Sequence, residues 1–130
     1  MRTNCSLSIL LLALGPLGCA HEVSSPTPFG FCAAPLAFAV VIAVNDSISG
    51  ASVADSARGV VQSGSDVDSL HLTYPPPRLA GGTQLGTYQV IVDRTGYREW
   101  TRNNVVVSQR EGPCNVIESV QLTALLQRAS

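Results

Sequence analysis

The sequence predicts an all-β fold, a two-sheet sandwich of seven short strands, and two observations carry this prediction. From residue 32 onward, short apolar runs are separated by Gly, Pro, Asn and Asp, as expected for strands joined by turns. No stretch keeps a 3.6-residue apolar period for longer than two turns, which argues against long helices. The length of 130 residues allows one such domain.

The first predicted strand, residues 36–46, is apolar on both faces, which is typical of a central or covered strand. A turn is expected at residues 45–52, where Asp46 can bond its own backbone and Gly50 can take a positive φ. The residues expected to share the inward face are Phe38, Val40, Ile42 and Val44.

The middle of the chain gives weaker patterns. We expect strands at residues 52–62 and 70–74, joined by a polar loop at 63–69. Residues 75–82 are expected to be irregular, because three prolines cannot join a central ladder and the glycines break any helix.

Residues 87–93 alternate strictly and predict a half-buried strand with its inward side chains at every second position. A turn follows at 93–97, in which Gly96 can adopt the left-handed conformation. The inward residues are expected to be Tyr88, Val90 and Val92.

The chain is expected to return along residues 98–109, with a bulge or loop at Asn103 and Asn104. A turn at 109–113 then leads into the last predicted strand, residues 114–126.

The N-terminus has the pattern of an export signal: Arg2, an apolar run over 7–14, and small residues around Cys19. The run is shorter than the roughly 20 residues of a membrane-spanning helix. Two processing routes stay open, lipidation with cleavage before Cys19 and ordinary cleavage after Ala20. Under the first, residues 1–18 form a lipoprotein signal peptide, 19–31 a Ser/Pro-rich tether and 32–130 the folded domain.

Two cysteines remain in the domain by either route, Cys32 and Cys114, and an exported protein meets an oxidising compartment. A disulfide between them would close a loop of about 80 residues and stabilise the fold by roughly 4 kcal/mol. The alternative is a pair of buried free thiols. Their positions have the inward parity of the first and last strands, so a bridge is geometrically reasonable.

Several residues together resemble the carboxypeptidase regulatory-like domain, a transthyretin-like seven-stranded sandwich. The motif Gly-x-Tyr-x-Val-x-Val at 86–92, followed by Gly96-Tyr97, matches the pattern of that family, and the turn from Asp46 to Gly50 matches more weakly. The resemblance covers residues 37–126. It implies a non-catalytic module that assists folding or mediates contacts, and lone lipoprotein versions often carry cysteines placed like Cys32 and Cys114.

The chemistry-bearing residues give little support to catalysis, so we expect no enzyme and no cofactor. Neither His21 nor His71 begins a zinc-binding HxxE or HExxH motif, and His71 is expected to be exposed. Asp66 and Asp68 have a spacing that can hold Ca²⁺ weakly, but the Gly and the terminal Glu of an EF-hand loop are missing, so a solvated loop is the favoured interpretation. The eight basic residues, all arginine, are balanced by nine acids and form no basic stripe, which excludes nucleic acid as an expected partner.

One surface stays open as a binding site. Trp100 has the same strand parity as Arg98 and Arg102, and exposed tryptophans stack on sugar rings or anchor partner proteins. The alternative is that Trp100 covers the edge of the sandwich. We therefore expect a lipid-anchored module of the bacterial cell envelope, in the outer membrane, whose partner is an envelope protein or polysaccharide. The second hypothesis is a secreted or periplasmic accessory domain that binds carbohydrate or peptide through its loops.

Overall fold

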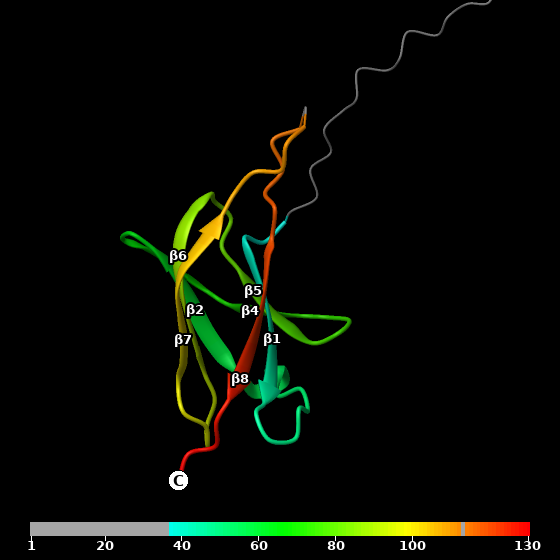
Figure 1. Cartoon of the computed structure of the whole chain (residues 1–130), viewed down its shortest axis with the longest axis vertical. Coiled ribbons are helices and arrows are strands. Elements are labelled where there is room, and N and C mark those ends of the chain that lie inside the picture. Colours follow the sequence, from blue (N-terminus) through cyan, green and yellow to red (C-terminus); the bar gives the residue numbers. More distant parts are fainter. Residues whose placement is uncertain (1–36, 113) are drawn as a thin grey trace, which may run out of the picture. The chain divides into compact units, whose positions relative to one another are not determined.

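The structure, a computed structural model, describes residues 37–112 and 114–130, which form two four-stranded β-sheets (Figure 1). One sheet has the strand order β4-β5-β1-β8 and the other the order β3-β2-β6-β7. The elements are β1 (Val40–Asp46), η1 (Ala54–Ser56), β2 (Arg58–Ser63), β3 (Asp66–Ser69), β4 (His71–Thr73), β5 (Arg78–Gly81), β6 (Gly86–Asp93), β7 (Trp100–Val107) and β8 (Val120–Leu126). The predicted all-β, two-sheet class is confirmed, but the described residues form eight strands and not seven.

The only helix among the described residues is the single 3₁₀ turn η1. Within the same part of the chain, no helix is long and apolar enough to cross a membrane.

The core lies between the sheets and is built from the alternating rows that the sequence predicts. In β1 the even-numbered residues are buried and the odd-numbered ones are half-buried. In β6 the side chains of Tyr88, Val90 and Val92 are at most 5% exposed. The other large apolar side chains that are fully buried are Ile42, Leu79, Leu126, Val40, Val44 and Val61.

The last strand is shorter than predicted. Residues 114–119 precede β8 and take part in sheet pairing only through an isolated bridge between Ile117 and Gln109. β8 itself runs parallel to β1 over its whole length, from the pair Val40 and Val120 to the pair Asp46 and Leu126. Its inward parity was predicted correctly, since Ala124 and Leu126 are fully buried.

The predicted loop at residues 63–69 is wrong, because Asp66–Ser69 forms β3 and pairs with β2. The chain then leaves this sheet at Leu70 and enters the other sheet as β4. Glycines make room for that crossing. The side chain of Leu70 packs close to the positions that a Cβ would occupy on Gly59 and Gly81.

The predicted irregular segment at residues 75–82 is also wrong in its second half. The prolines lie in the turn between β4 and β5, but Arg78–Gly81 is the strand β5, paired with β4 on one side and β1 on the other. No proline lies within the strand, so every residue of β5 has the backbone N–H that a central strand uses.

The three special backbone positions that the sequence predicts are confirmed. Gly50 and Gly96 have φ of +72° and +85°, in the left-handed region. β7 carries the predicted bulge, since the pairing with β6 shifts from Tyr88 opposite Val105 to Val90 opposite Arg102. Asn104, inside the bulge, is the one residue other than glycine with a positive φ among those described, at +56°.

Candidate functional site

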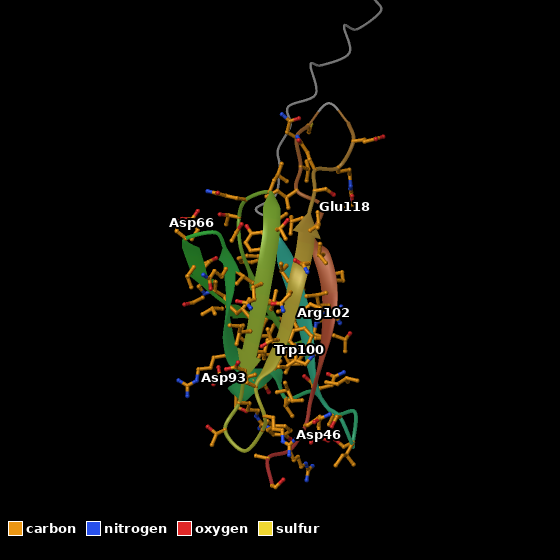
Figure 2. All side chains as sticks on the ribbon, turned by 60° about the vertical axis from the view of Figure 1, so that its left-hand side comes forward. Asp46, Asp66, Asp93, Trp100, Arg102 and Glu118 are labelled. Atoms are coloured by element: carbon orange, nitrogen blue, oxygen red, sulfur yellow. The ribbon has the colours of Figure 1, made fainter. Side chains whose placement is uncertain are left out.

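Trp100 begins β7 and lies opposite Val92, on the core side of the sheet. Its side chain is half-buried and packs against the hydrophobic core. Arg102 lies opposite Val90 on the same side of β7, and its guanidinium carbon is 5.7 Å from the centre of the Trp100 ring. Figure 2 shows the two labelled residues next to each other beside β7. A stacked guanidinium of this kind is a cation–π contact, which orients the indole.

Arg98 reaches the same region from the segment before β7. Its backbone N–H donates to the carbonyl oxygen of Gln127 at 2.8 Å, and its guanidinium donates to the hydroxyl of Ser130 at 3.4 Å. An open hollow of about 270 Å³ lies here, lined by Arg98, Glu99, Trp100, Thr101, Leu125 and Gln127. The structure therefore brings the three predicted residues together, with Arg98 and Trp100 in the wall of the hollow and Arg102 against the indole.

This surface has features of both interpretations of Trp100. Half of the indole is taken up by the core, as expected of a residue that covers the edge of the sandwich. The exposed half borders a hollow with an exposed apolar neighbour, Leu125, which is 54% exposed. The exposed part of the indole is therefore the part of Trp100 that a ligand in the hollow could contact.

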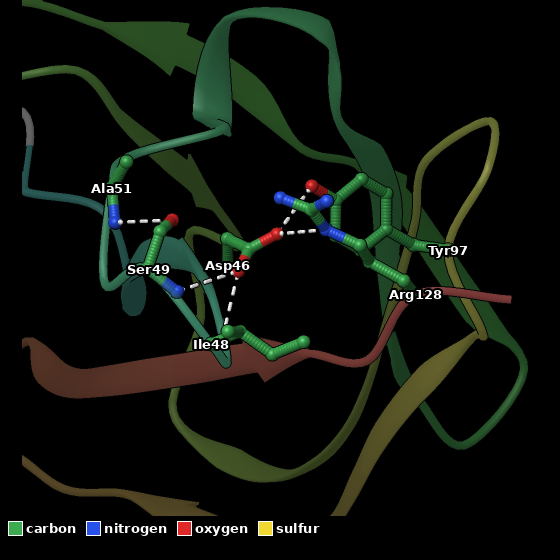
Figure 3. Close-up of polar contacts among 6 residues, drawn as sticks. All are labelled: Asp46, Ile48, Ser49, Ala51, Tyr97 and Arg128. Atoms are coloured by element: carbon green, nitrogen blue, oxygen red, sulfur yellow. Dashed lines mark hydrogen bonds and ion pairs between the residues drawn. The ribbon is translucent and has the colours of Figure 1, made fainter.

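A second cluster of polar groups surrounds Asp46 at the end of β1 (Figure 3). One carboxylate oxygen accepts the backbone N–H groups of Ile48 and Ser49, each at 2.8 Å. The other accepts the hydroxyl of Tyr97 at 2.7 Å and Nε of Arg128 at 2.9 Å. This cluster connects the β1 turn to the turn before β7 and to the C-terminal residues.

The electrostatics of the cluster follow from these contacts. The backbone N–H of Ser49 and the side chains of Tyr97 and Arg128 hold the pKa of Asp46 well below its ordinary value of 3.8. In turn, the hydrogen bond and charge of Asp46 raise the pKa of Arg128 above its ordinary value. Asp46 is therefore an anion throughout the neutral range, and its carboxylate oxygens are occupied by groups of the protein itself.

The sequence analysis found only part of this cluster. It predicted the turn and the bonds from Asp46 to its own backbone, but not Tyr97 or Arg128 as partners. The strand alternation could have indicated that Asp46 has such partners. Asp46 continues the inward row of Ile42 and Val44, and a buried carboxylate in such a row needs hydrogen-bond donors. Which side chains supply them depends on the spatial meeting of three chain segments, which the sequence does not show.

The remaining titratable residues singled out in the sequence do not gather into one site. His71 is exposed on β4, as predicted, with its ring 6.3 Å from that of Phe38. Asp68 accepts the backbone N–H of Gly82 at 2.9 Å, while Asp66 is exposed. A further acid, Glu118, lies toward the opposite end of the domain from Asp46 (Figure 2).

Within residues 37–112 and 114–130, no three His, Cys, Asp or Glu side chains lie close enough together to share a metal ion. Of the cysteines, Cys19 and Cys32 lie outside the described residues, and Cys114 is half-exposed in the segment before β8. Lipidation of Cys19 and the bridge between Cys32 and Cys114 therefore stay predictions.

A third feature lies on the outer face of the sheet β3-β2-β6-β7. A shallow hollow of about 480 Å³ is lined by Gln62, Gly64, Thr87, Gln89, Asn103 and Asn104. The amide nitrogen of Gln89 donates to the amide oxygen of Asn103 at 2.8 Å, and the amide nitrogen of Gln62 donates to the carbonyl oxygen of Gly64 at 3.3 Å. The sequence analysis predicted the bulge at residues 103–104 but not the amides that gather beside it.

Comparison with known proteins adds no relative to this description. Neither a scan against protein-family models nor a search of curated proteins gave a match to this chain.

Proposed function

We propose that this protein is a non-enzymatic lipoprotein of the bacterial cell envelope, and that its β-sandwich is a carboxypeptidase regulatory-like domain that serves as a binding or structural module. The proposal depends most on one observation. The residues that carry the family resemblance are all used by the scaffold: Tyr88, Val90 and Val92 are in the core, Gly96 makes the turn, and Tyr97 bonds Asp46. Because these motif residues build the scaffold, the motif supports assignment to a fold family and does not indicate an active site.

The titratable groups support a role other than catalysis. The buried acid, Asp46, accepts four hydrogen bonds from the protein and has no lone pair arranged toward a substrate. A general acid or base needs contact with the reacting group and a pKa near the working pH, whereas the pKa of Asp46 is lowered far below neutrality.

Anchoring through Cys19 is supported by the sequence alone: the apolar run, the Gly18-Cys19 pair that follows it, and the Ser/Pro-rich residues 19–31 that would serve as a tether. Metabolic labelling with a palmitate analogue tests it. We expect label in the native chain and none in Cys19→Ala, which should also leave the membrane fraction. Equal labelling of both chains would refute the anchor.

The proposed bridge between Cys32 and Cys114 has a separate test. Peptide mass mapping of protein isolated from the envelope without reduction should recover the two cysteines in one cross-linked peptide pair. Recovery of both as free thiols would show that no bridge staples the domain.

The hollow beside Trp100 favours a second candidate function, a secreted or periplasmic accessory domain that binds carbohydrate or peptide at this edge. Binding to a glycan or peptide array that is lost in Trp100→Ala, from a chain that carries no palmitate, would favour this candidate over the first. Arg110→Ala is a suitable control, because Arg110 is an exposed arginine in the turn after β7 and does not line the hollow.

A further inference from the structure

The outer face of the sheet β3-β2-β6-β7 carries an arrangement of side chains that the scaffold does not use. Its residues are outward because their neighbours Val61, Val90 and Val92 point into the core. Gln62 lies directly opposite Gln89 on the paired strands β2 and β6. Gln89 in turn bonds Asn103 on β7, so a row of amides crosses three adjacent strands.

The hydrogen bond inside this row orients the amides and leaves some of their donors and acceptors unpaired. A side-chain amide has two N–H donors and an oxygen with two lone pairs. The bond from Gln89 to Asn103 uses one donor and one lone pair. Gln89 keeps its oxygen and a second N–H, and Asn103 keeps its amide nitrogen, all in the wall of the same hollow.

The bulge in β7 brings a further amide into the hollow. Between the pairs Tyr88–Val105 and Val90–Arg102, β7 has one more residue than β6. The two residues of β7 in this interval are Asn103 and Asn104. Asn104 holds a φ of +56°, in the left-handed region that asparagine adopts more readily than most other residues with a side chain. Bulges are over-represented at sheet edges and next to active sites, where they redirect a side chain.

The face is also without charge around the amides. The pair Val60 and Ile91 forms the next row along the sheet, and the charged pair Arg58 and Asp93 follows only at the end of β2 and β6. All six residues in the wall of the hollow are uncharged. An anionic or cationic ligand would lose its hydration here without gaining an opposite charge.

We propose that this amide face, defined by Gln62, Thr87, Gln89, Asn103 and Asn104, binds a neutral oligosaccharide. A pyranose presents neighbouring hydroxyls that are each donor and acceptor, which complements fixed amides that offer both. Its C–H groups can lie on the aliphatic row of Val60 and Ile91, which is half-buried. The site rests on the proposed function only in that the domain is a binding module, and it is distinct from the hollow at Trp100.

Heteronuclear NMR of the exported full chain tests the proposal directly, because side-chain amide groups give their own signals. The probes are three neutral hexasaccharides, of the malto, cello and manno series, and polygalacturonate as the anionic comparison. At least one neutral hexasaccharide should shift the side-chain signals of Gln62, Gln89 and Asn103. Polygalacturonate should shift them less at the same sugar concentration.

Two variants measure the contribution of the amides. Asn103→Asp keeps the shape and the acceptor for Gln89 but replaces the outward donor, and Gln89→Ala removes the centre of the row. Each should weaken binding about tenfold, the loss expected for one or two hydrogen bonds. Gln121→Ala is the matched control: its amide bonds Arg78 on the outer face of the other sheet, so binding should be unchanged. Backbone spectra verify that each variant is folded.

Any one of the following results would overturn the proposal: no shift with any neutral hexasaccharide, equal binding by the two amide variants and the native chain, tighter binding of polygalacturonate, or loss of binding in Trp100→Ala. The same holds for shifts that depend on protein concentration alone, since a second copy of the chain would then be the occupant of the face. None of these results affects the palmitate-labelling test of the anchor, so the two proposals fail independently.

Discussion

Asp46 is an acid at the end of a row of buried aliphatic side chains, and the four hydrogen bonds of its carboxylate explain how it is tolerated there. A buried carboxylate is stable only when its oxygens are paired. Because the partners come from the β1 turn, from Tyr97 and from Arg128, a single residue holds three distant segments together.

This cluster predicts a defined dependence of stability on pH. The pKa of Asp46 in the folded state lies below the ordinary value of 3.8, so its stabilising contribution is complete above that value and is lost as the pH falls below it. Replacing Asp46 by Asn removes the charge and keeps the size. We expect Asp46→Asn to have a lower melting temperature at neutral pH and to lose less stability than the native chain on acidification, measured by thermal unfolding between about pH 7 and pH 3.

Asp66→Asn is the control for this measurement, since Asp66 is exposed on β3. It should melt like the native chain at neutral pH. An acid response in Asp46→Asn as steep as in the native chain would mean that other carboxylates are responsible.

Gly59 shows a different constraint at the residue scale, a lack of space. A Cβ at this position would overlap the backbone carbonyl oxygen of Ile91 and press on the side chain of Leu70. We expect Gly59→Ala to destabilise the domain by about 3 kcal/mol, because backbone must move in a packed sheet. Gly64→Ala has open space but a φ of +60°, and should cost only about 1 kcal/mol. Urea unfolding compares the two, and equal losses would show that Gly59 is not a crowded position.

At the scale of elements, the strands with strict alternation were predicted most closely, and two strands, β3 and β5, were missed. β1 and β6 are long, and each has one row of buried residues, so period and burial agree. β3 escaped prediction because its residues are mostly exposed and polar, and a hairpin edge strand buries little. β5 escaped because the preceding prolines suggested irregular chain, although they end before its first residue.

The central place of β5 gives a sharp test of the observed topology. Leu79 is 1% exposed and lies between β4 and β1, so Leu79→Ala should destabilise the domain by about 3 kcal/mol. Leu85→Ala, in the loop after β5, changes a side chain that is 49% exposed and should cost less than about 0.5 kcal/mol. Chemical denaturation measures both. If both variants lost equally little free energy of unfolding, residues 78–81 would be an irregular surface segment and not a central strand.

The candidate sites were predictable to different degrees for the same reason. Arg98, Trp100 and Arg102 lie within five residues of one another, and the parity of one strand was enough to place them together. The amide face draws Gln62 and Gln89 from strands that pair across a long stretch of sequence. Their meeting depends on the register between β2 and β6, which alternation within each strand does not fix.

At the scale of the described domain, the two sheets are connected along one side, where the edge strands β7 and β8 come together. At one end, backbone bonds join Arg110 to Val116 and Glu118 to Ser108. At the other end, Arg98 donates to Gln127 and Ala129 donates to Gly96. The closure of this side therefore depends on short segments outside the strands, and the C-terminal residues form half of it.

This arrangement predicts that residues 127–130 hold the Trp100 edge in place. Deleting them removes the backbone hydrogen bonds to Gly96 and Arg98. It also removes Arg128, which donates to the carboxylate of Asp46, and Gln127, which lines the hollow. We expect faster hydrogen exchange at the backbone N–H of Arg98, and a red-shifted, more easily quenched tryptophan fluorescence, because the half-buried indole becomes more exposed to water. Hydrogen exchange measures the change at Arg98. Acrylamide quenching measures the change at Trp100, which is the single tryptophan of the chain.

Deletion of Ser130 alone is the matched control, since it removes only the weak 3.4 Å bond to Arg98 and keeps Gln127, Arg128 and Ala129. Its fluorescence and exchange should match those of the native chain. The four-residue deletion should also leave exchange at β6 unchanged, because the backbone hydrogen bonds of Gln127 and Ala129 go to Arg98 and Gly96, outside β6. If the deletion instead leaves Trp100 emission and Arg98 exchange unaltered, the edge is held by the packing of Trp100 on the core alone, and the C-terminal segment has no part in presenting it.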